Sequence, residues 1–143
     1  MNDYPLTSLA TLVLIVLGWQ LGTRVSKARA AFAEQRRDAN KQHSLQVYSD
    51  PHFMIAFRNH LNLIEHLVLF LPTLWIFALR ISDGLAFILG LVYFLGRVLY
   101  SRNYSRGHSH RPGFLISYVS MLVLLTGALG SNILEVWTYF RGT

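Results

Sequence analysis

The stretch PGFLISYVSMLVLLTGALGSNIL, residues 112–134, decides the fold class, because none of its 23 residues carries a charged side chain. An α-helix rises 1.5 Å per residue, so about 20 apolar residues cross the roughly 30 Å hydrocarbon core of a bilayer. A second uncharged stretch, of 20 residues, lies between Asp3 and Arg24. Two such stretches in one chain indicate an integral membrane protein.

The composition of the 143-residue chain agrees with a membrane protein. Charged residues make up 14% and hydrophobic residues 52% of the chain, whereas charged residues are about 25% of an average soluble domain. The chain has no cysteine, which excludes disulfides, a thiolate nucleophile of its own and cysteine-ligated metal sites. If the protein carries out thiol chemistry, the thiol must arrive with a substrate. The length predicts one domain, residues 1–143.

Four apolar segments are predicted to cross the membrane as helices, since none alternates apolar and polar residues as a membrane β-strand does. The predicted spans are about residues 6–22, 58–79, 84–104 and 113–137. The first is predicted to be a retained helix and not a cleaved signal peptide, because its positive charges follow the apolar stretch. A tight turn at residues 81–84 makes spans two and three an antiparallel hairpin. The predicted fold is an all-α, integral membrane four-helix bundle.

The basic residues predict the orientation of the bundle. Six lie in residues 24–41 and four in 97–111, whereas the opposite side carries Arg80 and Arg141. Cytoplasmic connections are enriched in Lys and Arg, so the connections at about 24–52 and 105–112 are predicted to be cytoplasmic and both termini non-cytoplasmic. Anchoring to anionic headgroups explains the basic charge without nucleic acid. The compact length and the lack of a retrieval tail favour a bacterial inner membrane, with the endoplasmic reticulum as the alternative.

Polar residues inside two spans mark a candidate binding site, because ionisable groups are costly in a bilayer. Arg58, Asn62 and Glu65 follow the spacing i, i+4 and i+7, which places them on one helix face. The next span and the connection after it carry a second polar stripe, formed by Tyr93, Arg97, Tyr100, Tyr104 and Arg111. In the structural alternative, Glu65 pairs with Arg58 or Arg97 and locks the bundle, and the tyrosines belong to the interfacial belt. The surplus of positive charge favours a ligand with several carboxylates and one amine.

These residues resemble a known family. The segment RNHLNLIE, residues 58–65, looks like the R-x3-N-x2-E signature of the MAPEG family, the membrane-associated proteins in eicosanoid and glutathione metabolism. The polar stripe of the third span is similar to that of the leukotriene synthase and microsomal glutathione transferase branch, and ARAAF, residues 28–32, resembles the end of its first helix. The similarity runs from about residue 24 to 118. It implies a homotrimer of four-helix subunits that bind glutathione between neighbours on the cytoplasmic side.

The resemblance implies a role for each site residue. Arg111 would be catalytic and face the thiol, and Arg29 would contact a carboxylate from the adjacent subunit. The expected glutathione-binding residues are Arg29, Arg58, Asn62, Glu65, His66, Arg97, Tyr100 and Tyr104. His66 stands where the family has a tyrosine, and it either contacts the ligand or forms a hydrogen bond within the bundle.

Departures from the family's pattern narrow the expected activity. Ala30 stands where the leukotriene branch has a second arginine, Val68 replaces a proline, and His60 replaces a glutamine. They favour a general glutathione S-transferase, with glutathione peroxidase activity as a second reaction, over specialised leukotriene synthesis. Its partners would be glutathione, membrane lipids, and an apolar electrophile or a lipid hydroperoxide. The alternative is a non-catalytic membrane scaffold that binds lipid or protein.

The histidines predict neither a metal site nor a haem. His108 and His110 form a pair separated by one residue, and no third ligand has a clear place. A b-type haem would take two histidines from different spans, whereas His60 and His66 lie at the start of the same span. We therefore expect the chemistry of the site to come from arginines, tyrosines and the single glutamate.

Overall fold

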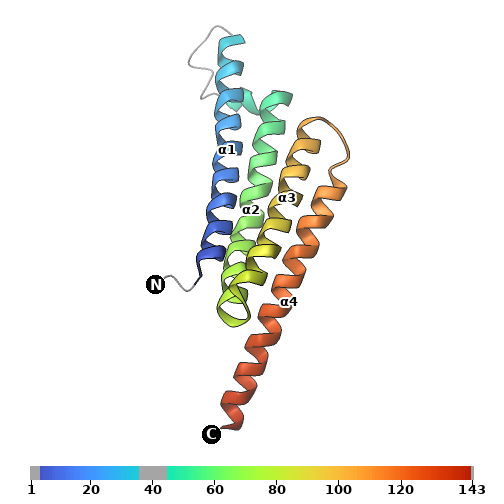
Figure 1. Ribbon diagram of the computed structural model, residues 1–143. Helices are drawn as coiled ribbons and strands as arrows, with labels where there is room; N and C mark the ends of the chain where they lie inside the picture. Colours follow the sequence, from blue (N-terminus) through green and yellow to red (C-terminus); the bar gives the residue numbers. More distant parts are fainter. Residues whose placement is uncertain (1–3, 36–44, 143) are drawn as a thin grey trace.

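The computed structural model describes residues 4–35 and 45–142, which form four long helices side by side (Figure 1). The helices are α1 (Pro5–Gln35), α2 (Pro51–Arg80), α3 (Asp83–Ser105) and α4 (Arg111–Arg141), and a short 3-10 helix, η2 (Leu45–Ser49), precedes α2. All four α-helices are long and apolar enough to cross a bilayer, and the described residues contain no strand. The predicted all-α membrane bundle is confirmed.

Local sequence sets where α2 and α3 begin. The carboxylate of Asp50 accepts a hydrogen bond from the N–H of Phe53 at 2.7 Å, and Pro51 stands in the first turn, where a missing N–H costs nothing. Ser82 caps α3 in the same way, with its hydroxyl accepting from the N–H three residues further on, at 3.4 Å. Since only residues 81 and 82 separate α2 from α3, the two helices form the predicted antiparallel hairpin.

The helices extend further than the spans predicted from hydropathy. α1 continues through the basic segment 24–29 to Gln35, so the predicted connection 24–52 begins as helix. Packing outside the apolar stretch explains the extension, because a separate cluster of buried residues joins the end of α1 to η2 and the start of α2. That cluster consists of Phe32, Val47 and Phe53. Residues 36–44, which hold three of the six basic residues of the predicted cytoplasmic segment 24–41, lie outside the described residues.

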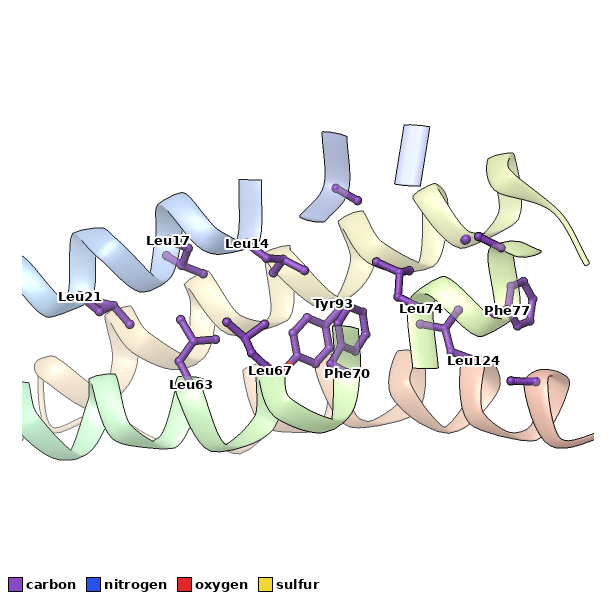
Figure 2. Close-up of a cluster of buried hydrophobic side chains, with 14 residues drawn as sticks. Leu14, Leu17, Leu21, Leu63, Leu67, Phe70, Leu74, Phe77, Tyr93 and Leu124 are labelled. Atoms are coloured by element: carbon purple, nitrogen blue, oxygen red, sulfur yellow. The ribbon is translucent and has the colours of Figure 1, made fainter. Parts of the chain in front are cut away.

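The main core is a row of apolar side chains between the helices (Figure 2). Its α1 and α2 members are Leu14, Leu17, Leu21, Leu63, Leu67, Phe70, Leu74 and Phe77. Phe70 stacks on Tyr93 of α3 with ring centroids 3.6 Å apart, and Leu124 of α4 is fully buried. Because these residues recur every three or four positions, each helix buries one face and leaves its other apolar residues, such as Leu12 and Trp19, exposed.

α3 and α4 approach each other backbone to backbone at two glycines. A Cβ atom on Gly96 would lie 2.7 Å from the backbone nitrogen of Ser117 and 2.9 Å from the carbonyl oxygen of Gly113, which is closer than real Cβ contacts. Small residues allow such approaches between membrane helices. Further along, the hydroxyl of Ser120 donates to the carbonyl of Leu89 at 2.6 Å. This interface fixes the polar stripe of α3 against the first turn of α4.

Polar contacts tie the other end of the bundle together. The backbone N–H groups of Leu6 and Thr7 donate to the carboxylate of Asp83 at 3.1 and 2.8 Å, so a residue of α3 satisfies the first turn of α1. Arg80 at the end of α2 forms an ion pair with Glu135 of α4, with 2.5 Å between nitrogen and oxygen. The α2–α3 turn therefore holds the start of α1 and the late turns of α4.

Candidate functional site

A groove of about 400 Å³ opens between the first half of α2 and the last turns of α3. It lies near the end of the bundle where α1 ends and α4 begins (Figure 1). Its lining residues are Met54, Phe57, Arg58, Leu61, Asn62, Glu65, Tyr100 and Tyr104. Five of the eight were predicted as glutathione-binding residues, so the structure brings the two polar stripes together in one site.

The charged residues of the groove face outwards and are not paired with each other. Arg58 and Glu65 are exposed, and within residues 4–35 and 45–142 Glu65 forms no ion pair with Arg58 or Arg97. Arg58 and Glu65 are seven positions apart on α2, which corresponds to a rise of about 10 Å along the helix axis. One guanidinium and one carboxylate at that separation suit a ligand that carries both an ammonium and a carboxylate group.

Arg97 lies behind the groove and does not line it. The side chain is 2% exposed, and its Nη2 atom donates to Oδ1 of Asn62 at 2.7 Å. Its guanidinium carbon also lies 4.7 Å from the ring centroid of Tyr100. Since Oδ1 of Asn62 accepts from Arg97, the amide NH2 of Asn62 remains as a donor. Nε and Nη1 of Arg97 have no hydrogen-bond partner within the described part of the chain, so unused positive charge sits directly behind two groove residues.

His110 completes an aromatic cluster at the rim of the groove. Tyr100 and Tyr104 stack with ring centroids 5.7 Å apart, and the ring of His110 meets both edge-on at 5.1 and 5.6 Å. His110 was considered from the sequence only as half of a metal pair. Only the path of the chain between α3 and α4 reveals this contact with the tyrosines, because five residues separate Tyr104 from His110 along the sequence.

A braced turn places His110 and the residue after it. Gly107 adopts φ +70°, a conformation that residues with a side chain rarely take. The backbone carbonyl of Asn103 accepts hydrogen bonds from the N–H groups of Arg106 and His108 at 3.1 and 3.0 Å. The side-chain amide of Asn103 donates a hydrogen bond to the carbonyl of Ser109 at 3.1 Å. The chain therefore leaves α3 and enters α4 within a few residues, close to the two tyrosines.

Besides Arg97, three predicted site residues do not line the groove. Arg111 is exposed in the first turn of α4, directly after His110. Arg29 of α1 lies with its guanidinium carbon 5.2 Å from the ring of Phe53. His66 is half-buried on α2, with its ring 6.4 Å from that of Phe114. The structure thus places Arg111 directly after His110 in the chain, Arg29 on another helix and His66 against α4.

Comparison with known proteins gives a consistent result. The chain is 33% identical over 125 residues to an uncharacterized protein of Synechocystis sp., which covers 87% of this chain and 82% of that protein. It is 40% identical over 87 residues to microsomal glutathione S-transferase 2 of Homo sapiens, covering 59% of this chain and 58% of the relative. It is 34% identical over 82 residues to leukotriene C4 synthase of Rattus norvegicus, covering 56% and 55%.

The match to a family model extends over most of the bundle. The model of the MAPEG family aligns with residues 5–131, which include α1, α2 and α3 entirely and most of α4. That alignment contains every residue that lines the groove. Because the family model spans all four helices, this chain belongs to the MAPEG family.

Proposed function

We propose that the groove binds glutathione and that the protein is a membrane-bound glutathione S-transferase. The proposal is carried by one observation: an arginine, an amide, a glutamate and two tyrosines line a single groove without an ion pair among them. Glutathione carries two carboxylates, one ammonium and a thiol. Glu65 suits the ammonium, Arg58 suits a carboxylate, and Asn62 supplies a donor.

We further propose that a second subunit covers the open side of the groove and completes the site. α2 and α3 supply all the residues that line the groove, and Arg58, Leu61 and Glu65 are exposed beside it. A neighbouring copy would cover this face and bring its own Arg29 to the second carboxylate. The expected assembly is a homotrimer, with the groove on the cytoplasmic side of the membrane.

Arg111 supplies the chemistry in this proposal. A free thiol with a pKa of about 8.5 is only a few per cent thiolate at pH 7, and a neighbouring cation raises that fraction. A guanidinium remains charged at every working pH, so Arg111 stabilises the thiolate without titrating. The thiolate attacks an electrophilic carbon of an apolar substrate, so that a thioether forms as the leaving group departs. With a lipid hydroperoxide, two glutathiones are oxidised to the disulfide while the hydroperoxide is reduced to an alcohol and water.

Glutathione binding and turnover separate this proposal from a non-catalytic scaffold. We expect saturating glutathione to raise the Tm of the detergent-solubilised protein by several degrees, because a ligand that binds only the folded state stabilises it. The same protein should conjugate glutathione to 1-chloro-2,4-dinitrobenzene. The analogue with serine in place of cysteine should raise the Tm without turnover. Stabilisation by glutathione without conjugation would favour a binding protein, and the absence of both would favour the scaffold.

Replacing Glu65 by glutamine is expected to weaken glutathione binding about tenfold or more, because a charge-assisted hydrogen bond to the ammonium is lost. Isothermal titration calorimetry measures the change. Glu135→Gln removes a carboxylate at the opposite end of the bundle and should leave the affinity unchanged. Equal affinity in Glu65→Gln and the unmodified protein would assign Glu65 a structural role instead.

A further inference from the structure

A second groove lies between α1 and α3 and has no assigned role. Its volume is about 520 Å³, which exceeds that of the groove between α2 and α3. It is lined by Leu17, Gln20, Leu21, Arg24, Phe94, Val98, Ser101, Arg102, Ser105 and Arg106. None of these residues lines the other groove, so the two sites are separate.

The lining changes from apolar to basic along the helices. On α3, Phe94, Val98 and Arg102 follow at intervals of four residues and lie on one helix face, and Arg106 follows directly after the last residue of the helix. On α1, Leu17 and Leu21 precede Arg24. The apolar residues therefore lie nearer the middle of the bundle, and the arginines lie towards the end where the basic connections begin. The α3 part alone, from Phe94 to Ser105, extends about 16 Å along the helix axis.

The positive charge of this groove is not balanced by the protein. Arg24, Arg102 and Arg106 are all exposed, and the described lining contains no acidic side chain. Between the described residues, none of these three arginines forms an ion pair with a carboxylate. Several guanidinium groups around one cavity attract an anion, and phosphate oxygens match their donor geometry.

We propose that this groove binds an anionic phospholipid. The headgroup phosphate would lie among Arg24, Arg102 and Arg106, and an acyl chain would follow Val98 and Phe94 towards the middle of the membrane. A free anion would use only the basic end, whereas a lipid uses both ends of a continuous groove. The exposed side chain of Val98 leaves the apolar half accessible from the bilayer. This site is independent of the proposed glutathione site.

The test measures how two lipids bind to the 143-residue protein in detergent. Native mass spectrometry gives the amount of each lipid that is retained, and thermal unfolding gives the change in Tm. We expect dioleoyl phosphatidylglycerol to be retained at least about fivefold more than dioleoyl phosphatidylcholine, and to raise the Tm more. In the double variant Arg102→Gln/Arg106→Gln the two lipids should be retained about equally. Lys27→Gln removes an exposed charge at the same end of α1 and outside the groove, so its preference should match that of the unmodified protein.

Each other outcome overturns the proposal. Equal retention of the two lipids, or a preference that survives in the double variant, would show that the groove does not select the headgroup. An equal loss in Lys27→Gln would reduce the effect to general surface charge. A rise in Tm with glycerol 3-phosphate that equals the rise with phosphatidylglycerol would identify a free-anion site. If the double variant does not fold, Arg102→Gln alone is measured, and glutathione binding reports whether each variant is intact.

Discussion

Replacing Arg111 by alanine is expected to lower kcat/KM for 1-chloro-2,4-dinitrobenzene by about 100-fold or more, because removing one group that stabilises a developing or bound anion typically has an effect of this size. The fold should survive, since Arg111 is exposed in the first turn of α4. The loss should be greatest near neutral pH. As the pH rises towards about 8.5, an unassisted thiol ionises by itself and the variant should regain part of its rate.

The controls for this prediction separate charge from position. Arg111→Lys keeps a cation at the site and should retain more activity than Arg111→Ala, although a point charge cannot reproduce the planar guanidinium. Arg141→Ala removes an arginine from the far end of α4 and should leave kcat/KM unchanged. The ultraviolet absorbance of bound thiolate should fall in Arg111→Ala alone. Turnover equal to that of the unmodified protein would remove Arg111 from the proposed mechanism.

Replacing Gly113 by alanine is expected to lower the Tm by several degrees and to weaken glutathione binding. A Cβ atom at this position would meet the backbone nitrogen of Tyr100, and it would lie 2.7 Å from the carbonyl oxygen of Gly96. Backbone atoms cannot move aside as a flexible side chain can, so α3 and α4 must separate. Overpacking of this kind costs about 1–3 kcal/mol. Because Tyr100 lines the groove, its displacement should also be measurable as a lower affinity in calorimetry.

Gly130 provides a matched control on the same helix. A Cβ atom at Gly130 would have nothing within 4 Å, and alanine is a better helix former than glycine by about 1 kcal/mol. Gly130→Ala should therefore keep or raise the Tm, whereas Gly113→Ala lowers it. If both variants were as stable as the unmodified protein, the close approach of α3 and α4 would not be a determinant of stability.

The fold could be predicted from the sequence because the bilayer imposes a simple rule on it. A charge-free stretch of about 20 residues has to be a spanning helix, and a two-residue connection leaves only an antiparallel hairpin. The helix ends could not be predicted in the same way. Hydropathy marks where a chain enters hydrocarbon, whereas the end of α1 depends on the packing of Phe32 near Val47 and Phe53, which are distant in sequence.

The candidate site was predictable as far as it follows helix periodicity. The spacing of Arg58, Asn62 and Glu65 gives a common face, and the structure adds Tyr100 and Tyr104 to the same groove. The spacing of residues along a helix does not determine how deeply each side chain is buried or how the helix is rotated within the bundle. Arg97 shares a stripe with the tyrosines but lies behind Asn62, and His110 contacts Tyr100 and Tyr104 only because of the turn at Gly107. The ligand contacts of all nine predicted site residues remain predictions.

The length of α4 has a consequence for how deep the protein sits. Its 31 residues span about 46 Å, more than the roughly 30 Å of hydrocarbon, and its last turns project past the α2–α3 turn (Figure 1). These turns carry exposed Trp137 and Tyr139, aromatic side chains that settle at the boundary between lipid and water. Trp137 and Tyr139 are thus expected to anchor the C-terminal end of α4 at one surface of the bilayer. Arg111 is the first residue of the same helix, at its other end. In the proposed enzyme, membrane thickness would then set the height of Arg111 above the acyl chains, so thicker and thinner bilayers would present dissolved substrates to it at different levels.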